Sequence, residues 1–151
     1  NTLTIGNEVY KLQQFHFHAP AENEIDGQTY PLEGHFVYKT DNGKITVVSV
    51  LYNYGDENQA LKQIWDKMPQ AANTETELPQ AISLYDFYPE DKDYYNFEGS
   101  LTTPPCTEGV NWIVFKNQET VSKEQVEKFT QTLGFENNRP IQDTNGRQIK
   151  E

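Results

Sequence analysis

Two histidines two residues apart, in the stretch QFHFHAPAENE at 14–24, are the first side chains of the sequence that could do chemistry. The third and last histidine, His35, stands in PLEGHFVYK. Residues i and i+2 of a β-strand project from one face, so we predict that His16 and His18 point together while Phe15 and Phe17 face the other way. A neighbouring strand could bring His35 beside them, because opposed side chains there lie about 5 Å apart. The pattern predicts a cluster of three imidazoles.

Three neutral imidazoles are a typical ligand set for a catalytic zinc ion. They bind at roughly 2.0 to 2.1 Å and leave the fourth tetrahedral position open for water. Metal-bound histidines usually offer their second ring nitrogen to a carboxylate, an amide or a carbonyl. Gln14 lies two residues before His16, and Glu33 lies two before His35, so each shares the face of its histidine. The sequence therefore indicates a Zn²⁺ site with supporting partners.

Two other interpretations of the histidines are open at this point. An H-x-H motif also occurs on a half-buried strand that simply turns polar residues to water. H-x-H followed by Glu22 also fits the first motif of cupin barrels, in which that glutamate would be a fourth ligand to iron or manganese. A cupin's second motif should bring a Pro-x-Gly turn shortly before its last histidine and an asparagine just after it. PLEGHFVYK has neither in register.

Composition excludes several functions. The 12 Lys and Arg against 23 Asp and Glu give a net charge of -11, which disfavours binding to nucleic acid or to an anionic membrane surface. No apolar stretch approaches the length of a membrane span. The single cysteine, Cys106, excludes a disulfide within this chain and any multi-cysteine metal site. Chemistry must come from histidines, carboxylates and hydroxyls.

The secondary structure predicted for the chain is mainly β, with a few helices, in one domain over residues 1–151. Stretches rich in β-branched and aromatic residues predict strands at 9–19, 34–40, 44–55, 94–100 and 110–116. The DNG at 41–43 predicts a tight hairpin turn. We expect long surface connections at 69–93 and 135–151.

Two helices are predicted from apolar residues at helical spacing. The first lies within 56–69, with Asp56 as N-cap and Pro69 as its stop. The second lies within 122–134, where Ser122 and Gln125 form a capping-box pattern and Gly134 suits the end. Both are interpreted as packing elements.

The segment GSLTTPPCTEGVNWIVF at 99–115, with QFHFHAPAENE and EGHFVYK, resembles the α-class carbonic anhydrases, most closely their bacterial branch. The likeness continues to NNRPIQDTNGRQI near the end. It implies a large twisted, mostly antiparallel central sheet with peripheral helices. It also implies a zinc lyase that interconverts carbon dioxide and bicarbonate through zinc-bound hydroxide. Inhibition by sulfonamides or small anions is implied too.

The resemblance assigns roles to individual residues. It makes the three histidines the zinc ligands, with Gln14, Glu33 and the main-chain carbonyl near Asn137 holding their second nitrogens. Thr102 matches the family's gatekeeper threonine, and Glu22 would accept its hydroxyl proton so that the threonine oxygen orients the hydroxide. Thr103 corresponds to the hydroxyl residue at the substrate position. The apolar side of the pocket is matched by Val37, Val47, Leu101, Val110 and Trp112.

Members of the family also carry an N-terminal portion with an early cysteine, for which this sequence shows no counterpart. The resemblance therefore implies a family domain without its N-terminal part, completed by a dimer partner or a separate N-terminal fragment. Cys106 matches the partner of the early cysteine, which implies a periplasmic or secreted protein. A catalytically silent carbonic anhydrase-like binding module is the alternative function. Such modules typically lose a zinc histidine, whereas this chain has all three.

Overall fold

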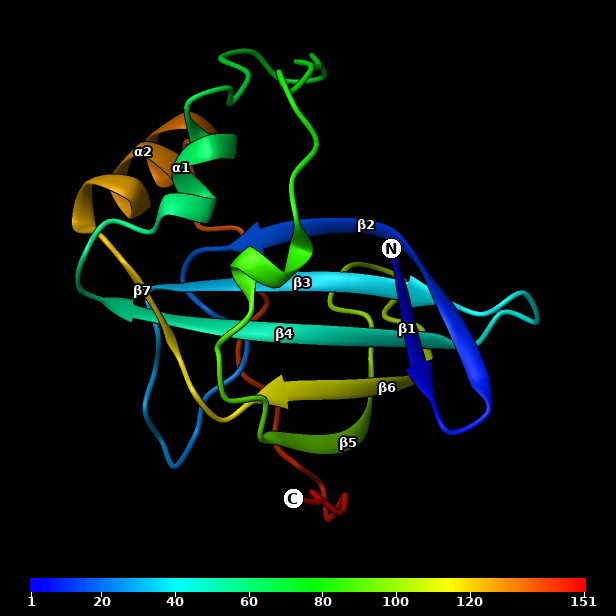
Figure 1. The fold of residues 1–151 in the computed structure, drawn as a ribbon. Coiled ribbons are helices and arrows are strands. Elements are labelled where there is room, and N and C mark those ends of the chain that lie inside the picture. The colour runs from blue at the N-terminus through cyan, green and yellow to red at the C-terminus, as the bar shows by residue number, and fades with distance from the viewer.

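A single seven-stranded sheet forms the centre of the computed structural model, which describes residues 1–151 (Figure 1). Six strands follow the order β1-β2-β3-β4-β6-β5. The seventh, β7, pairs with the C-terminal part of β4, past the residues of β4 that pair with β6. Only the pairs β4–β6 and β4–β7 are parallel. The predicted class, mainly β with a mostly antiparallel sheet, is confirmed. The strands are β1 (Thr2–Ile5), β2 (Glu8–His18), β3 (Leu32–Lys39), β4 (Ile45–Tyr54), β5 (Tyr94–Ser100), β6 (Glu108–Phe115) and β7 (Glu119–Val121).

All five predicted strands are present, with ends shifted by at most two residues. The hairpin turn at 41–43 is confirmed, because Gly43 donates its N–H to the carbonyl of Thr40 at 3.0 Å and has a φ of 94°. Strands β1 and β7 were not predicted. With four and three residues they are too short for an alternating pattern to identify them.

The helices are α1 (Gln59–Trp65), α2 (Lys123–Leu133) and a short 3₁₀ helix, η1 (Leu84–Phe87). The prediction of Asp56 as N-cap was wrong, since the side chain of Asn58 accepts the N–H of Leu61 at 3.0 Å and starts α1 there. For α2 the capping box and the left-handed Gly134 are confirmed. The expected surface connection at 69–93 is wrong in part, because η1 buries Leu84 and Phe87. No helix is long and apolar enough to cross a lipid bilayer.

The sheet separates two apolar clusters, because successive side chains of a strand point to opposite faces. The larger cluster includes Phe36 and Val48 and extends to the helices, where Trp65 of α1 stacks on Phe129 of α2 with ring centroids 5.3 Å apart. The smaller cluster contains Val47, Val110 and Trp112. The histidine-bearing face of the sheet belongs to this smaller cluster, away from the helices.

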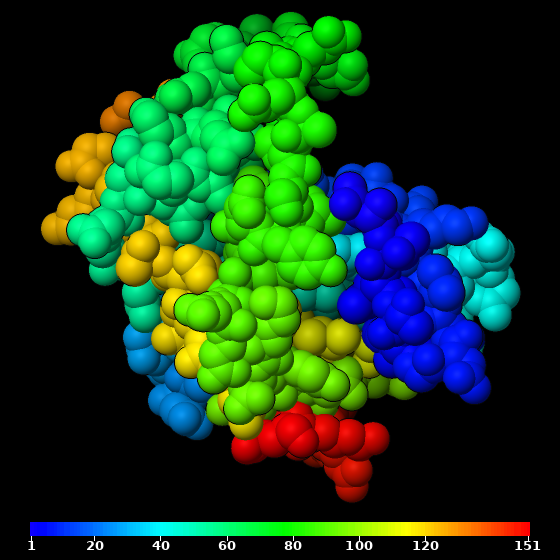
Figure 2. All heavy atoms as spheres, viewed as in Figure 1, coloured from blue at the N-terminus to red at the C-terminus, as the bar shows by residue number.

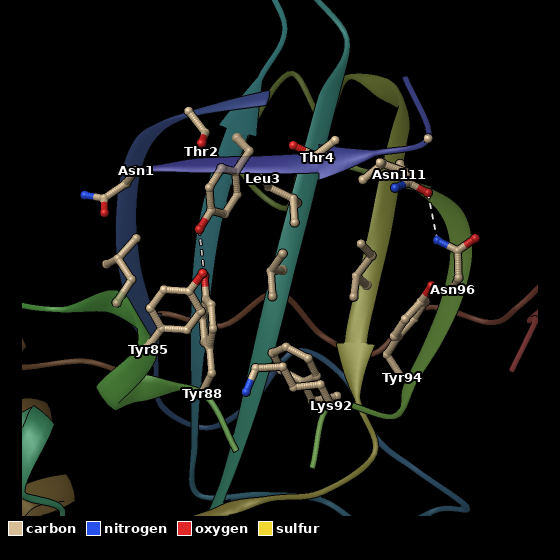
Figure 3. A pocket seen from close by; sticks show the side chains of 17 residues that line it. Asn1, Thr2, Leu3, Thr4, Tyr85, Tyr88, Lys92, Tyr94, Asn96 and Asn111 are labelled. Atoms are coloured by element: carbon tan, nitrogen blue, oxygen red, sulfur yellow. Dashed lines mark hydrogen bonds between the residues drawn. The ribbon is translucent and has the colours of Figure 1, made fainter. Parts of the chain in front are cut away.

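The face with the larger cluster carries an open hollow of about 760 Å³ between β1 and the segment around η1 (Figure 2). Tyr85 and Tyr88 line one side, and Asn96 with Asn111 line the other (Figure 3). The hollow lies across the sheet from the histidines, because its floor residue Val48 alternates with Val47 of the smaller cluster. The chemistry predicted from the sequence is therefore not in this hollow.

Candidate metal centre

The register between β2 and β3 brings the three histidines together. His16 lies directly opposite His35, and His18 lies two residues further along β2 on the same face. The three ring centroids are 4.7 to 5.4 Å apart. One ligand atom from each histidine lies within 4.8 Å of the others. Tetrahedral nitrogen ligands of Zn²⁺ stand about 3.4 Å apart, so small ring rotations give a metal-binding arrangement.

Each ring has one nitrogen engaged by the protein. Nδ1 of His16 lies 2.7 Å from Oε1 of Gln14, and Nδ1 of His18 lies 2.9 Å from the carbonyl oxygen of Asn137. Nε2 of His35 lies 2.9 Å from Oε1 of Glu33, in a geometry bent away from a linear hydrogen bond. This leaves Nε2 of His16, Nε2 of His18 and Nδ1 of His35 as the atoms for a metal. The buried Nε2 of His18 has no hydrogen-bond partner.

Burial and neighbouring charges keep the rings of His16 and His18 in the neutral form that binds metals. Burial, and then the nearby imidazoles of His35 and His18, lower the pKa of His16 to about 4. Burial, followed by His35, also lowers the pKa of His18. Both rings are therefore neutral at pH 7, as a metal requires of histidine.

Glu33 is the most fully engaged residue of the centre and is completely buried. Its Oε2 accepts the main-chain N–H groups of Glu22 and Asn23 at 2.7 and 2.9 Å. Its Oε1 accepts the side-chain amide of Asn23 and the hydroxyl of Ser49. Burial alone would raise the pKa of Glu33, but His35 and these hydrogen bonds lower it to about 2. Sequence reasoning missed Ser49 and Asn23, because neither stands near Glu33 in the chain.

Asn137 holds His18 from 119 residues away in the sequence. Besides its main-chain contact with that ring, its side chain accepts the N–H of Ala19 at 2.9 Å and donates to the carbonyl of Phe17 at 2.8 Å. The connection at 135–151 is exposed along much of its length, as expected, yet it is anchored to the end of β2 at this residue.

Glu22 and Thr102 line one small pocket beside the histidines. Oε1 of Glu22 lies 3.3 Å from Nδ1 of His18 and accepts the main-chain N–H of Arg139 at 2.5 Å. Its Oε2 is buried without a partner, 3.9 Å from Nδ1 of His35. The expected hydrogen bond from Thr102 to Glu22 is not formed in this structure. Arg139, which the sequence did not single out, is instead the partner of Glu22.

The apolar residues assigned by resemblance gather in one place. Val47, Val110 and Trp112 are buried in the smaller cluster, and Val37 and Leu101 pack against it. The indole of Trp112 meets the ring of His35 edge-on, with centroids 4.9 Å apart. Thr103 is exposed, in the turn where its carbonyl accepts the N–H of Cys106. The cluster forms an apolar wall next to the three imidazoles.

Comparison with known proteins gives consistent matches. The family model described as eukaryotic-type carbonic anhydrase matches residues 2–151. A carbonic anhydrase of Pectobacterium carotovorum is 46% identical over 99% of this chain and 61% of its own length. One of Neisseria gonorrhoeae is 47% identical over 100% of this chain and 60% of its own length. This chain thus spans about three-fifths of these relatives.

A solved structure, the complex of α-carbonic anhydrase from Thermovibrio ammonificans with the inhibitor sulfanilamide, superimposes with a TM-score of 0.94. It is 46% identical and covers 97% of this chain and 65% of that chain. The cupin interpretation is wrong, because the family match and the sheet exclude it and Glu22 is not in the histidine ligand group. From its imidazole cluster, its fold and these matches, the chain belongs to the eukaryotic-type carbonic anhydrase family.

Proposed function

We propose that this chain carries the zinc centre of an enzyme that reversibly hydrates carbon dioxide to bicarbonate and a proton. The observation that supports this most is the three-imidazole cluster, in which each ring has one nitrogen within 2.9 Å of a protein oxygen and the His35 ring packs against Trp112 of the apolar wall. A bound Zn²⁺ supplies hydroxide at neutral pH, since it lowers the pKa of its water to about 7 in carbonic anhydrases.

The residues of the chain would divide the work around that ion. His16, His18 and His35 would hold it, while Gln14, Glu33 and Asn137 fix the rings. Glu22 would accept the hydroxyl proton of Thr102, so that the threonine oxygen orients the attacking group. Its free Oε2 is the acceptor available for that bond.

The apolar wall suits carbon dioxide, which carries no charge and does not require hydrogen bonds. Its residues are Val37, Val47, Leu101, Val110 and Trp112, with Thr103 proposed at the substrate position.

Metal analysis combined with stopped-flow measurement of carbon dioxide hydration tests the proposal. We expect one zinc per chain, lost together with activity in His35→Ala; equal metal content and equal rates would refute it. Gln14→Ala should weaken zinc binding about 10- to 100-fold, as loss of a ligand-orienting partner does. Gln13→Ala is the matched control on the neighbouring position of β2, because Gln13 is exposed and its side chain donates one hydrogen bond, to the carbonyl of Lys11.

The silent binding module is the alternative outcome of the same experiment. Protein that binds no metal, yet remains folded, would favour it, whereas zinc with hydration activity would exclude it. Sulfanilamide and small anions are proposed as inhibitors at the histidine cluster, because the superimposed Thermovibrio structure contains sulfanilamide. Inhibition of carbon dioxide hydration by sulfanilamide in the wild type, together with calorimetric binding of sulfanilamide that is lost in His35→Ala, would support this.

We further propose that β2 accepts an added strand, from a second copy or from a separate N-terminal fragment. β1 pairs with β2 only over Glu8–Lys11, so the half of β2 that carries the histidines has one paired side. A second apolar hollow of about 770 Å³ beside Phe15 and Phe17 flanks this edge. Unpaired strand edges are templates for β-pairing. Light scattering should show a dimer, or a monomer that binds such a fragment; a monomer that binds none would refute the proposal.

A bacterial, periplasmic or secreted setting is proposed for the protein. The matches to bacterial carbonic anhydrases support the first part, and the partly exposed free Cys106 is available for pairing in an oxidising compartment. Fractionation of the source cells, with the chain found in the cytoplasm, would contradict the second part.

A further inference from the structure

Both arginines of the sequence line the small pocket that Glu22 and Thr102 border beside the histidines. This cavity of about 80 Å³ is bounded by Arg139 and Arg147 together with Ser100, Thr102 and Trp112. Clustering of the two guanidinium groups is notable in a chain whose net charge is -11.

Neither arginine is neutralised by a carboxylate. Every ion pair between a fixed cation and a carboxylate in the structure uses a lysine. Arg139 donates through Nη1 to Oγ of Ser100 and through Nη2 to Oε1 of Gln142, both at 3.3 Å. Arg147 donates only to main-chain carbonyls, at 2.8 to 3.2 Å. A guanidinium has five N–H donors, so both arginines keep donors without a protein acceptor.

The second guanidinium is held in place by its surroundings. Cζ of Arg147 lies 5.7 Å from the centre of the Phe97 ring, in a cation–π contact. A Cβ atom at Gly99 would lie 3.4 Å from Nη1 of Arg147 and 3.0 Å from the indole of Trp112. The distance to Arg147 is an ordinary contact, whereas the distance to Trp112 is tighter than most Cβ contacts, so a larger residue at position 99 would require the indole that lines the pocket to shift.

One carboxylate, that of Glu22, borders the pocket, and one of its two oxygens is engaged. Its Oε1 accepts the main-chain N–H of Arg139, and its side chain is 2% exposed. Two guanidinium groups against one carboxylate leave an excess of one positive charge. An anion placed between the arginines would use donors that the protein leaves free.

We propose that this pocket binds a small oxyanion of the carboxylate type. A guanidinium group can donate two parallel hydrogen bonds to the two oxygens of a carboxylate. Because the two groups carry opposite charges, these bonds are stronger than hydrogen bonds between neutral groups. The volume is about that of two or three water molecules, which suits an anion with on the order of four non-hydrogen atoms, such as bicarbonate or acetate. The inference does not depend on the proposed zinc chemistry.

Titration of metal-free protein, followed by the NMR signals of the arginine Nε–H groups, tests the pocket without anion binding to a metal. Acetate and bicarbonate in separate titrations should each give saturable shifts, whereas chloride at equal ionic strength should not, because it cannot offer two oxygens. Saturation by bicarbonate alone or by acetate alone would still support an oxyanion site and would identify its ligand. Chloride shifts equal to those of the oxyanions would overturn the proposal, as would the absence of saturation with both.

Variants locate the binding. Arg147→Gln should weaken the anion affinity about tenfold or more, as expected for loss of a charge-assisted hydrogen bond. Arg147→Lys keeps the charge but removes the fork, so it should also weaken binding and serves if the first variant does not fold. Lys39→Gln makes the same charge change at an exposed lysine at the end of β3, and should leave the affinity unchanged. Equal weakening by Lys39→Gln and Arg147→Gln would show non-specific attraction and refute the site.

Discussion

The carboxylate of Glu33 gives the sharpest quantitative test of how the metal centre is built. We consider Glu33→Gln in metal-free protein, which keeps the shape of the side chain and removes its charge. In the wild type, every neighbour of the carboxylate is a hydrogen-bond donor: His35, Ser49, Asn23 and two main-chain N–H groups. The variant places an amide N–H group, itself a donor, against these donors. Because the residue is completely buried, solvent cannot replace these contacts.

The pKa of Glu33 sets the size of the effect. Its fall from the ordinary 4.5 to about 2 corresponds to about 3 kcal/mol of folding free energy at neutral pH. A lowered carboxyl pKa stabilises the folded state above the unfolded pKa, and this contribution is lost as the pH falls through the folded pKa. The loss therefore runs from about pH 4.5 to about pH 2, and roughly 1 kcal/mol of it should be gone at pH 3.5.

Urea unfolding, followed by tryptophan fluorescence at pH 7 and pH 3.5, measures the difference between Glu33→Gln and the wild type. We expect about 3 kcal/mol at pH 7 and a clearly smaller difference at pH 3.5. Glu24→Gln is the matched control, since it removes the same charge at an exposed position and should change stability little. A difference below 1 kcal/mol at pH 7, or one that does not depend on pH, would refute the reasoning.

Three further predictions concern other contacts. Tyr52→Phe should leave the free energy of unfolding unchanged or raise it by about 1 kcal/mol, because the buried hydroxyl of Tyr52 has no partner. Tyr38→Phe loses a 2.8 Å hydrogen bond to the hydroxyl of Tyr88, so it should lower the free energy of unfolding by about 1 kcal/mol in the same urea assay. Gln125→Ala should lower the free energy of unfolding by about 2 to 4 kcal/mol, because it leaves the buried main-chain N–H and C=O of Asn58 without hydrogen-bond partners. Ser122→Ala, which removes only the helix cap, should lower it by roughly 1 kcal/mol; equal losses would contradict this. Carbon dioxide hydration by this chain should be slow and rise strongly with added imidazole in stopped-flow assays, because all three histidines are in the cluster; rapid buffer-independent turnover would count against it.

Local patterns predicted the parts of the structure that depend on local physics. The period of two along β2 placed His16 and His18 on one face, and the DNG turn and the capping box of α2 follow from the residues that form them. The choice of Asp56 as the cap of α1 failed because a capping oxygen must reach an N–H two or three residues ahead. Asn58 meets that condition with Leu61.

Long-range contacts could not be predicted from the residues alone. The parallel pairing of β4 with β6 joins strands that are separated by more than 50 residues and carry no signal of their direction. The resemblance to a family supplied the carbonyl near Asn137, but not the amide contacts of that side chain with the end of β2. It also did not supply Arg139, whose contribution is a main-chain N–H that any residue type could provide.

The metal centre combines tight positioning with incomplete hydrogen bonding. The ring nitrogens that do not face the metal position contact three segments: Gln14 of β2, Glu33 of β3 and Asn137 of the C-terminal connection. The cluster therefore exists only when these distant segments are folded together. At the same time Nε2 of His18 and Oε2 of Glu22 are buried without partners, and such atoms cost about 1 to 3 kcal/mol each. An ion that binds only the folded arrangement would offset this cost, because ligand binding to the native state adds to its stability. The fold thus spends stability to keep three imidazoles directed at one point, which is the condition under which a metal is bound without rearrangement of the chain.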